Sequence, residues 1–333
     1  GTRGFLSLDA FRKIGDLGNL GVRVFFVISG YLITSLLLQE LEAHGKVDFK
    51  AFYLRRAFRI FPAFYAYLAV VAVLSAISIL AVPWVDLARA AAYVSNFFSE
   101  RAWATGHSWS LSVEEQFYLL WPLALFFARS TKGIWVAVFV FAAAPFARIG
   151  VWTFMPEDRA LIGEAFPTVA DAIACGCALA ILAPKLSASA RYQRFLRSPA
   201  FVLVPLVALA MNQLDKHARF FFSVGTSVLD VGIALTVDRC VRVFDGPVGR
   251  VLNLRPVRWI GTLSYSLYLW QQLFLNRTSD ALVCRFPFNV SLAFLCATCS
   301  YYLVERPMLR LRGRIERRRA RPVAPPEPAR RAA

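Results

Sequence analysis

Two carboxylates and a histidine stand at the mouth of an apolar stretch of this chain. Glu114 and Glu115 lie in the run Trp109–Pro122, and His107 comes two residues before it. Charge at the edge of a bilayer core is costly and is usually retained for function or for capping a helix. Carboxylates and imidazoles are the common acceptors of a hydroxyl proton in general base catalysis. The run therefore predicts a site of acid–base chemistry, with Glu114 as the first candidate and His107 as the second.

The helix expected here decides what each group can do. If it starts near Ser112, Glu114 shares one face with Phe117, Tyr118 and Trp121. The alternative for Glu114 is a carboxylate solvated at the membrane edge. Ser112 and Glu115 have the spacing of a capping box, which favours a structural role for Glu115. For His107 an ordinary hydrogen bond in a loop is the alternative.

The surrounding sequence is that of a membrane protein. The chain has 333 residues, of which 58% are hydrophobic and only 18% charged, and its mean hydropathy is +0.52. Apolar blocks of roughly the length that crosses a bilayer predict an all-α, polytopic bundle of transmembrane helices. We expect about nine spans, near residues 21–40, 62–83, 113–128, 134–154, 168–184, 199–214, 219–238, 260–276 and 281–304.

The net charge of +17 is divided among membrane edges rather than gathered on one face. Most Lys and Arg residues fall in alternate connections and in the C-terminal segment, as the positive-inside rule expects for cytoplasmic segments. This distribution argues against nucleic acid as a partner and places the C-terminus in the cytoplasm. The basic residues can also contact membrane lipids. The six cysteines form no disulfide framework, and Cys296 and Cys299, which share a helix face, are best explained as packing residues. The three histidines are far apart in the sequence, and their spacing indicates no metal site.

Buried polar groups in the predicted spans give three structural expectations. Arg148 and Asp171 should pair, because charges in a membrane seldom stand alone. Ser29 and Gly30 should allow two helices to approach closely. Glu305, two residues before Pro307, should mark the end of the last helix.

Six stretches, taken in order, resemble the acyltransferase 3 family of integral membrane enzymes, which acylate cell-surface sugars. The resemblance covers about Leu6 to Arg310. The stretches are Leu8–Arg12, Gly21–Thr34, Phe52–Pro62, Trp109–Pro122, Gly261–Trp270 and Glu305–Pro307.

The resemblance implies ten transmembrane helices, an acyl-CoA donor, most often acetyl-CoA, and a hydroxyl of a glycan or lipid-linked sugar as acceptor. No bound cofactor is expected. It predicts a membrane acyltransferase domain over residues 6–310, a basic, disordered cytoplasmic tail over 311–333, and a multi-pass protein of the bacterial inner (plasma) membrane.

The resemblance also gives roles to side chains. The face of Glu114 would border the acceptor, with aromatic rings stacked against it. The basic residues Arg12, Arg55, Arg56 and Arg59 would hold the phosphates of the donor, although Arg55, Arg56 and Arg59 have the alternative of anchoring the protein to lipid headgroups. The candidate acceptor-binding residues are Trp109, Ser110, Tyr118, Ser264 and Tyr265.

Two departures bear on catalysis. The resemblance implies a histidine after Arg12 and ten intervening residues, at position 23, but Arg23 stands there, and only eight residues separate Arg12 from Gly21. The resemblance therefore predicts that the family's first helix and its histidine are missing, and Gln271 replaces a further expected histidine. Two alternatives remain open, namely a catalytically impaired relative that binds glycan or lipid, and a transporter or flippase.

Overall fold

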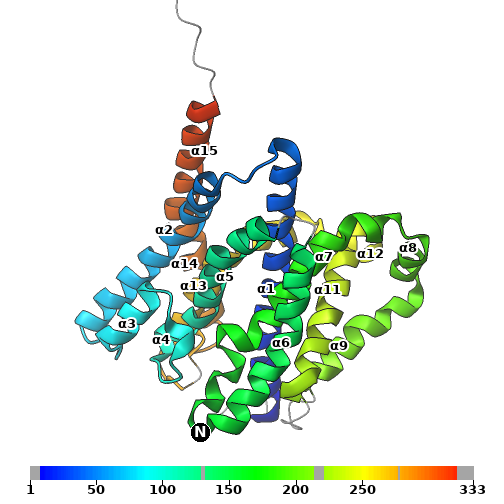
Figure 1. Ribbon diagram of the computed structural model, residues 1–333. Helices are drawn as coiled ribbons and strands as arrows, with labels where there is room; N and C mark the ends of the chain where they lie inside the picture. Colours follow the sequence, from blue (N-terminus) through cyan, green and yellow to red (C-terminus); the bar gives the residue numbers. More distant parts are fainter. Residues whose placement is uncertain (1–7, 129–131, 214–220, 277, 321–333) are drawn as a thin grey trace, which may run out of the picture. The chain divides into compact units, whose positions relative to one another are not determined.

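The computed structural model describes residues 8–128, 132–213, 221–276 and 278–320, and within them the regular elements are all helical (Figure 1). The all-α, polytopic fold predicted from the sequence is confirmed. These residues form two compact units. The first comprises residues up to Asp48 and Ser75–Thr262, and the second comprises Phe49–Leu74 and the residues from Leu263 onward.

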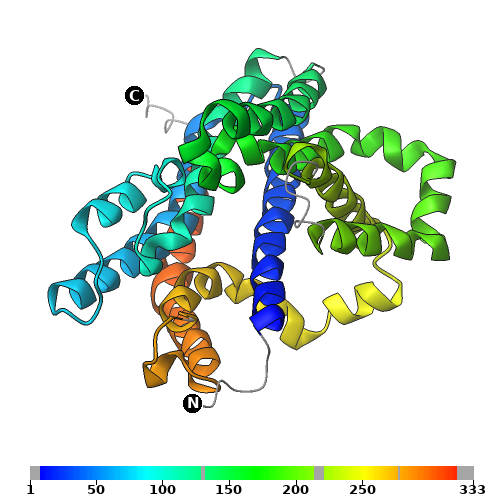
Figure 2. The ribbon, with the colours of Figure 1, turned by 90° about the horizontal axis from the view of Figure 1, so that it is seen from below.

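The first unit contains the longer helices around which the site is built. They are α1 (Leu8–His44), α5 (Ser108–Phe127), α6 (Gly133–Phe154), α7 (Phe166–Ala188), α9 (Leu203–Gln213) and α11 (Thr226–Arg242). The shorter elements are α3 (Trp84–Ala91), η1 (Ser95–Phe97), α4 (Trp103–Gly106), η2 (Pro156–Gly163), α8 (Ala190–Arg197), η3 (Pro199–Val202), η5 (Phe221–Gly225) and α12 (Pro247–Leu252). Helix α7 lies at the centre and packs against α1, α6 and α11 (Figure 2).

Helix α1 carries the first two motifs of the resemblance on one continuous helix. It runs without a break from Leu8 to His44. The segment between Arg12 and Gly21 is therefore a helical continuation, and no separate helix lies between these motifs. Arg12 falls on this helix, but its side chain lies outside the described part of the chain.

The crossing of α1 and α7 is made by two glycines. An added Cβ on Gly30 would lie 2.2 Å from the carbonyl oxygen of Ile173, and one on Gly176 would lie 2.0 Å from that of Val27. Each glycine thus sits directly against the backbone of the other helix. Small residues permit this approach in membranes, where packing replaces the hydrophobic effect as the force between helices. The packing role expected for Gly30 is confirmed.

The second unit has its own internal links. It holds most of α2 (Phe49–Ala76), the later part of α13 (Arg255–Phe274), η6 (Leu282–Cys284), and the succession α14 (Phe288–Ser300), η7 (Tyr301–Glu305) and α15 (Arg306–Ala320). The Tyr265 hydroxyl donates to the Ile60 carbonyl at 2.9 Å, and the rings of Tyr67 and Trp270 meet edge to face. These contacts join α13 to α2.

Five helices of the described residues are long and apolar enough to cross a membrane. They are Gly18–His44, Phe49–Ala76, Gly133–Phe154, Pro156–Ala188 and Phe288–Arg317. A sixth span results if the pair Ala190–Arg197 and Pro199–Asn212, bent by 68°, counts as one. Together with the family membership shown below, they make this a multi-pass membrane protein.

Three local expectations were wrong. Helix α5 begins at Ser108 rather than near Ser112, so Ser112 lies inside it and donates to the Ser108 carbonyl at 3.0 Å instead of capping. Glu305 does not end the last helix, which continues through α15. The expected boundary of a disordered tail at residue 311 falls within α15, because Arg, Leu and Glu favour helix. Residues 321–333 lie outside the described residues.

The close crossing of α1 and α7 predicts that one added methyl group at Gly30 lowers the stability of the protein strongly. Gly30→Ala places a Cβ where a backbone carbonyl lies, so α1 and α7 must separate, and we expect a loss of at least about 2 kcal/mol of unfolding free energy. Thermal unfolding in detergent measures it. Gly21→Ala on the same helix meets nothing within 4 Å and should leave stability unchanged or raise it slightly. Equal melting temperatures for both variants would contradict the close crossing.

Candidate functional site: a polar cavity over paired buried charges

Arg148 of α6 is almost completely buried, and its two terminal nitrogens donate to a set of oxygens. Its Nη1 donates to Asp171 of α7 at 2.8 Å and to the Thr168 carbonyl at 2.7 Å. Its Nη2 donates to the Ser227 hydroxyl at 2.7 Å, and that hydroxyl donates to Asp171 at 2.6 Å. The side chains of Arg148 and Asp171 are 1% and 0% exposed. The pairing predicted for these two charges is confirmed.

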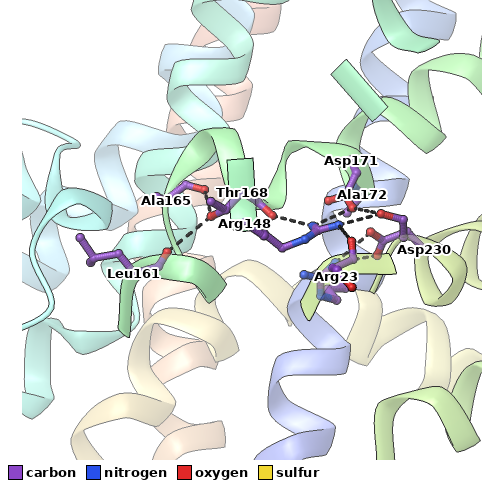
Figure 3. Close-up of polar contacts among 10 residues, drawn as sticks. Arg23, Arg148, Leu161, Ala165, Thr168, Asp171, Ala172 and Asp230 are labelled. Carbon is purple, nitrogen blue, oxygen red and sulfur yellow. Dashed lines mark hydrogen bonds and ion pairs between the residues drawn. The ribbon is translucent and has the colours of Figure 1, made fainter. Parts of the chain in front are cut away.

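A second ion pair lies beside the first. Nη1 of Arg23 on α1 donates to both carboxylate oxygens of Asp230 on α11, at 2.9 and 2.8 Å. The two arginines, from α1 and α6, and the two aspartates, from α7 and α11, lie together in Figure 3. Because each guanidinium faces a carboxylate, the group is close to neutral as a whole, which is the condition for keeping charges away from water.

A cavity of about 340 Å³ opens beside these pairs. Its lining joins the early part of α1, the start of α5, η2 and the adjoining ends of α6, α7, α9 and α11. The residues that line it are Asn19, Arg23, Phe26, Trp109, Arg148, Arg159, Ala160, Ile162, Gly163, Glu164, Val169, Asn212 and Thr226. It thus offers guanidinium and amide donors, one carboxylate and an indole ring, a set suited to an oxygen-rich ligand.

The wall made by η2 is held by ionic contacts. Glu164, just after η2, forms an ion pair with Arg101 from the loop after η1. Arg101 also donates to the Ser95 carbonyl at 2.7 Å. Arg159 places its guanidinium 4.6 Å from the centre of the Trp152 ring. The contacts of Arg101 hold Glu164, the carboxylate that lines the cavity among the described residues.

The candidates on α5 lie mostly beneath the surface. Glu114 is buried and accepts from the Tyr118 hydroxyl at 3.2 Å, and that hydroxyl is 2.8 Å from the Ser29 hydroxyl of α1. Trp121 donates to Thr34 at 2.8 Å. The predicted face is therefore packed against α1, and Glu114 is neither solvated nor part of the cavity lining. Its catalytic role stays a prediction.

The residues at the start of α5 divide between the cavity and the interior. Trp109 lines the cavity and meets Phe26 edge to face, with centroids 6.0 Å apart. Ser110 is buried and donates to the His107 carbonyl at 3.2 Å. His107 is buried, and burial lowers its pKa to about 3. The imidazole is neutral at physiological pH and is a weak base.

The remaining candidates belong to the second unit. Arg55 and Arg56 are half-buried on α2 and Arg59 is exposed. Ser264 is exposed, whereas Tyr265 is committed to the Ile60 carbonyl. Ser266 donates to the buried Glu305. Three of the four predicted donor-binding arginines, Arg55, Arg56 and Arg59, thus belong to the second unit, whereas Arg12 and the predicted catalytic residues belong to the first.

Sequence reasoning gave no site role to Arg23, Glu164 or Asp230. Asp230 contacts a residue 207 positions away, and no local pattern indicates such a pair. Glu164 belongs to no motif. The available signal was weaker: Arg23 and Asp230 are charges at the edge of, or within, apolar blocks, which is itself a reason to suspect a function.

A comparison of the whole sequence with known families decides the classification. The model described as an acyltransferase domain, that of the acyltransferase 3 family, matches residues 2–304. The chain belongs to the acyltransferase 3 family. The motifs from Leu8 to Trp270 fall within this match, and the polar cavity lies in an acyltransferase domain.

Three relatives of this acyltransferase domain have curated names. The chain is 26% identical over 330 residues to a putative peptidoglycan O-acetyltransferase, YrhL, of Bacillus subtilis. This alignment covers 87% of the chain and 50% of the relative. It is 27% identical to the peptidoglycan O-acetyltransferase OatA of Listeria monocytogenes, over 87% and 51%. It is 28% identical to the O-acetyltransferase OatA of Staphylococcus aureus, over 87% and 52%. The chain spans about half the length of these relatives, and no solved structure matches it.

The buried pair of this acyltransferase 3 domain predicts a large loss of stability when it is broken. Asp171→Asn leaves the Arg148 guanidinium without its carboxylate, and we expect unfolding to become easier by about 3 kcal/mol. Arg197 and Asp245 form an exposed pair at 4.0 Å, so Asp245→Asn should cost less than about 1 kcal/mol. Melting temperatures in detergent compare the two. A similar small loss for Asp171→Asn would show that the buried pair contributes little.

Burial of His107 predicts a dependence of stability on pH. Its folded pKa of about 3 lies below the usual value of 6.5, so the unfolded chain binds the extra proton as pH falls below 6.5. Stability should therefore drop with falling pH, by about 1.4 kcal/mol per unit between these values. Melting temperatures from pH 7 to pH 5 measure the slope, which should be shallower in His107→Gln. Parallel curves for the two proteins would contradict the buried neutral state.

Proposed function

We propose that this chain is an O-acetyltransferase that moves an acetyl group from acetyl-CoA to a hydroxyl of a cell-wall or exported glycan. The observation that carries the proposal is the family match over residues 2–304 together with relatives named as peptidoglycan O-acetyltransferases. The polar cavity supports it, because indole, amide and guanidinium groups are the contacts that a sugar uses.

The acceptor would bind in the cavity, with a sugar face on the Trp109 ring. Transfer joins the acceptor oxygen to the acetyl carbonyl carbon while the carbon–sulfur bond of the thioester breaks. The hydroxyl proton must go to a base, and coenzyme A leaves as a thiolate. Glu164 is the carboxylate that lines the cavity, and we place the proton there. Arg101 positions it. Glu114 is the alternative base suggested by its motif.

The donor would bind to the second unit. Arg55, Arg56 and Arg59 of α2 are fork-shaped donors suited to the phosphates of coenzyme A. They lie in the first turns of α2, the end of this helix that the charge distribution assigns to the cytoplasm, where acetyl-CoA is found. By the same argument the C-terminus is cytoplasmic. The bacterial inner membrane is proposed from the family membership.

A second candidate is a relative that binds glycan without transferring acetyl groups. Arg23 favours it, because this residue stands where the resemblance implies a histidine and is engaged by Asp230. An arginine is always protonated and cannot act as a base. Binding of glycan without acetylation is the outcome that distinguishes this candidate.

Acetyl transfer is tested with membranes that contain the chain, radiolabelled acetyl-CoA and soluble cell-wall glycan fragments. We expect label in the glycan, and a loss of about 100-fold or more in Glu164→Gln, because general base catalysis is worth about that much. Glu114→Gln should retain transfer, since the amide can still accept from Tyr118. If Glu114→Gln loses transfer and Glu164→Gln retains it, the base is Glu114.

Two controls complete the assay. Glu157→Gln changes an exposed carboxylate near the same wall and should transfer normally. Acetyl-pantetheine lacks the nucleotide phosphates of coenzyme A, so glutamine at Arg55, Arg56 and Arg59 should raise KM for acetyl-CoA but not for this analogue. If the glycan stays unlabelled with both acetyl donors and the protein still binds glycan, the chain binds glycan without transferring acetyl groups, as the second candidate states.

A further inference from the structure

One edge of the Arg23 guanidinium has no hydrogen-bond acceptor among the described residues, and the side chain lines the cavity. Its Nη1 is engaged by Asp230, but Nε and Nη2 donate to no acceptor among the described residues. The side chain is 14% exposed and lines the cavity. The Nε–Nη2 edge of a guanidinium has the spacing that binds the two oxygens of a carboxylate or phosphate at once.

The charges around the cavity leave a positive excess. Arg23 is matched by Asp230, Arg148 by Asp171 and Glu164 by Arg101. Arg159 also lines the cavity, but its described contacts are the Trp152 ring and the Trp152 carbonyl, neither of which carries a charge. Arg159 is exposed and has no carboxylate partner among the described residues, so it adds a positive charge that attracts an anion to the cavity.

The other wall of the cavity is suited to a sugar ring. Trp109 is held against Phe26 on the side of α1, and the amides of Asn19 and Asn212 line the same space. Aromatic rings pack against the apolar face of a sugar, and amides bond its hydroxyls. A volume of about 340 Å³ is at the small end of ligand sites and suits a terminal unit rather than a long polymer.

We infer that this cavity binds a glycan unit that bears an acidic group, a carboxylate or a phosphate. The Nε–Nη2 edge of Arg23 holds the acidic group, Arg159 supplies the balancing charge, and Trp109 covers the sugar face. The inference rests on the proposed function for its sugar, and it adds that the acceptor is an acidic sugar rather than a neutral one.

Binding is tested on the purified full chain in detergent, by the shift in melting temperature with ligand concentration at constant ionic strength. The probes are glucuronic acid for the carboxylate, glucose 1-phosphate for the phosphate and methyl glucoside as the neutral sugar. At least one acidic sugar should bind about tenfold or more tightly than the neutral one, as charge-assisted hydrogen bonds predict. The acidic sugar that binds more tightly shows whether the cavity prefers a carboxylate or a phosphate.

Variants separate the two walls. Arg159→Gln should remove most of the preference for the acidic sugar, and so should Arg23→Gln combined with Asp230→Asn, which leaves no unpaired buried charge. Trp109→Leu should weaken acidic and neutral sugars alike. Arg250→Gln, an exposed arginine outside the cavity lining, should change nothing.

Three outcomes would overturn the inference. The first is equal binding of acidic and neutral sugars. The second is that inorganic phosphate or acetate, without a sugar, raises the melting temperature as much as the acidic sugars do. The third is that coenzyme A raises the melting temperature and that Arg159→Gln removes this effect as it removes that of the acidic sugars. Binding does not require acetyl transfer, so an inactive protein that prefers acidic sugars would refute only the proposed function. Transfer to acidic and neutral acceptors with the same KM would refute only the inference.

Discussion

The pairing of buried charges is the constraint on which the first unit depends. A guanidinium or carboxylate away from water is tolerable only when a partner of opposite charge and further hydrogen bonds replace its hydration. Arg148 meets this condition through Asp171, Ser227 and two backbone carbonyls. These partners come from α7, η5 and α11, so the bonds of one arginine hold three elements around α6.

Neutralisation inside the unit also sets what the cavity can do. Were both aspartates absent, the exposed part of Arg23 would face a ligand as one of several unbalanced cations. With Asp230 on Nη1, the guanidinium is held in one orientation and presents a defined edge. A binding group that is already oriented loses less entropy when a ligand arrives, so the ion pair serves to position the residue.

Sequence reasoning predicted the fold class because long apolar blocks have few solutions in a bilayer. It predicted the Arg148–Asp171 pair because two charges in neighbouring apolar blocks need each other. It could not predict Arg23–Asp230, since the contact depends on how α1 and α11 are packed. Helix boundaries were less certain for a similar reason: Ser112 has the local pattern of a cap, but hydrogen bonds further upstream let α5 begin at Ser108. Glu164 was missed because its place in the cavity depends on η2 and Arg101, which no spacing shows.

The contact between α1 and α7 has a consequence for how this protein can change. In most helix pairs a larger residue on one side can be accommodated by a smaller one opposite. Gly30 and Gly176 meet backbone atoms rather than each other's side chains, and glycine has no side chain left to shorten. Neither position can therefore compensate for growth at the other, and the two helices can tolerate mutation there only by moving apart, which would also displace Arg23 and Asp171 from their partners.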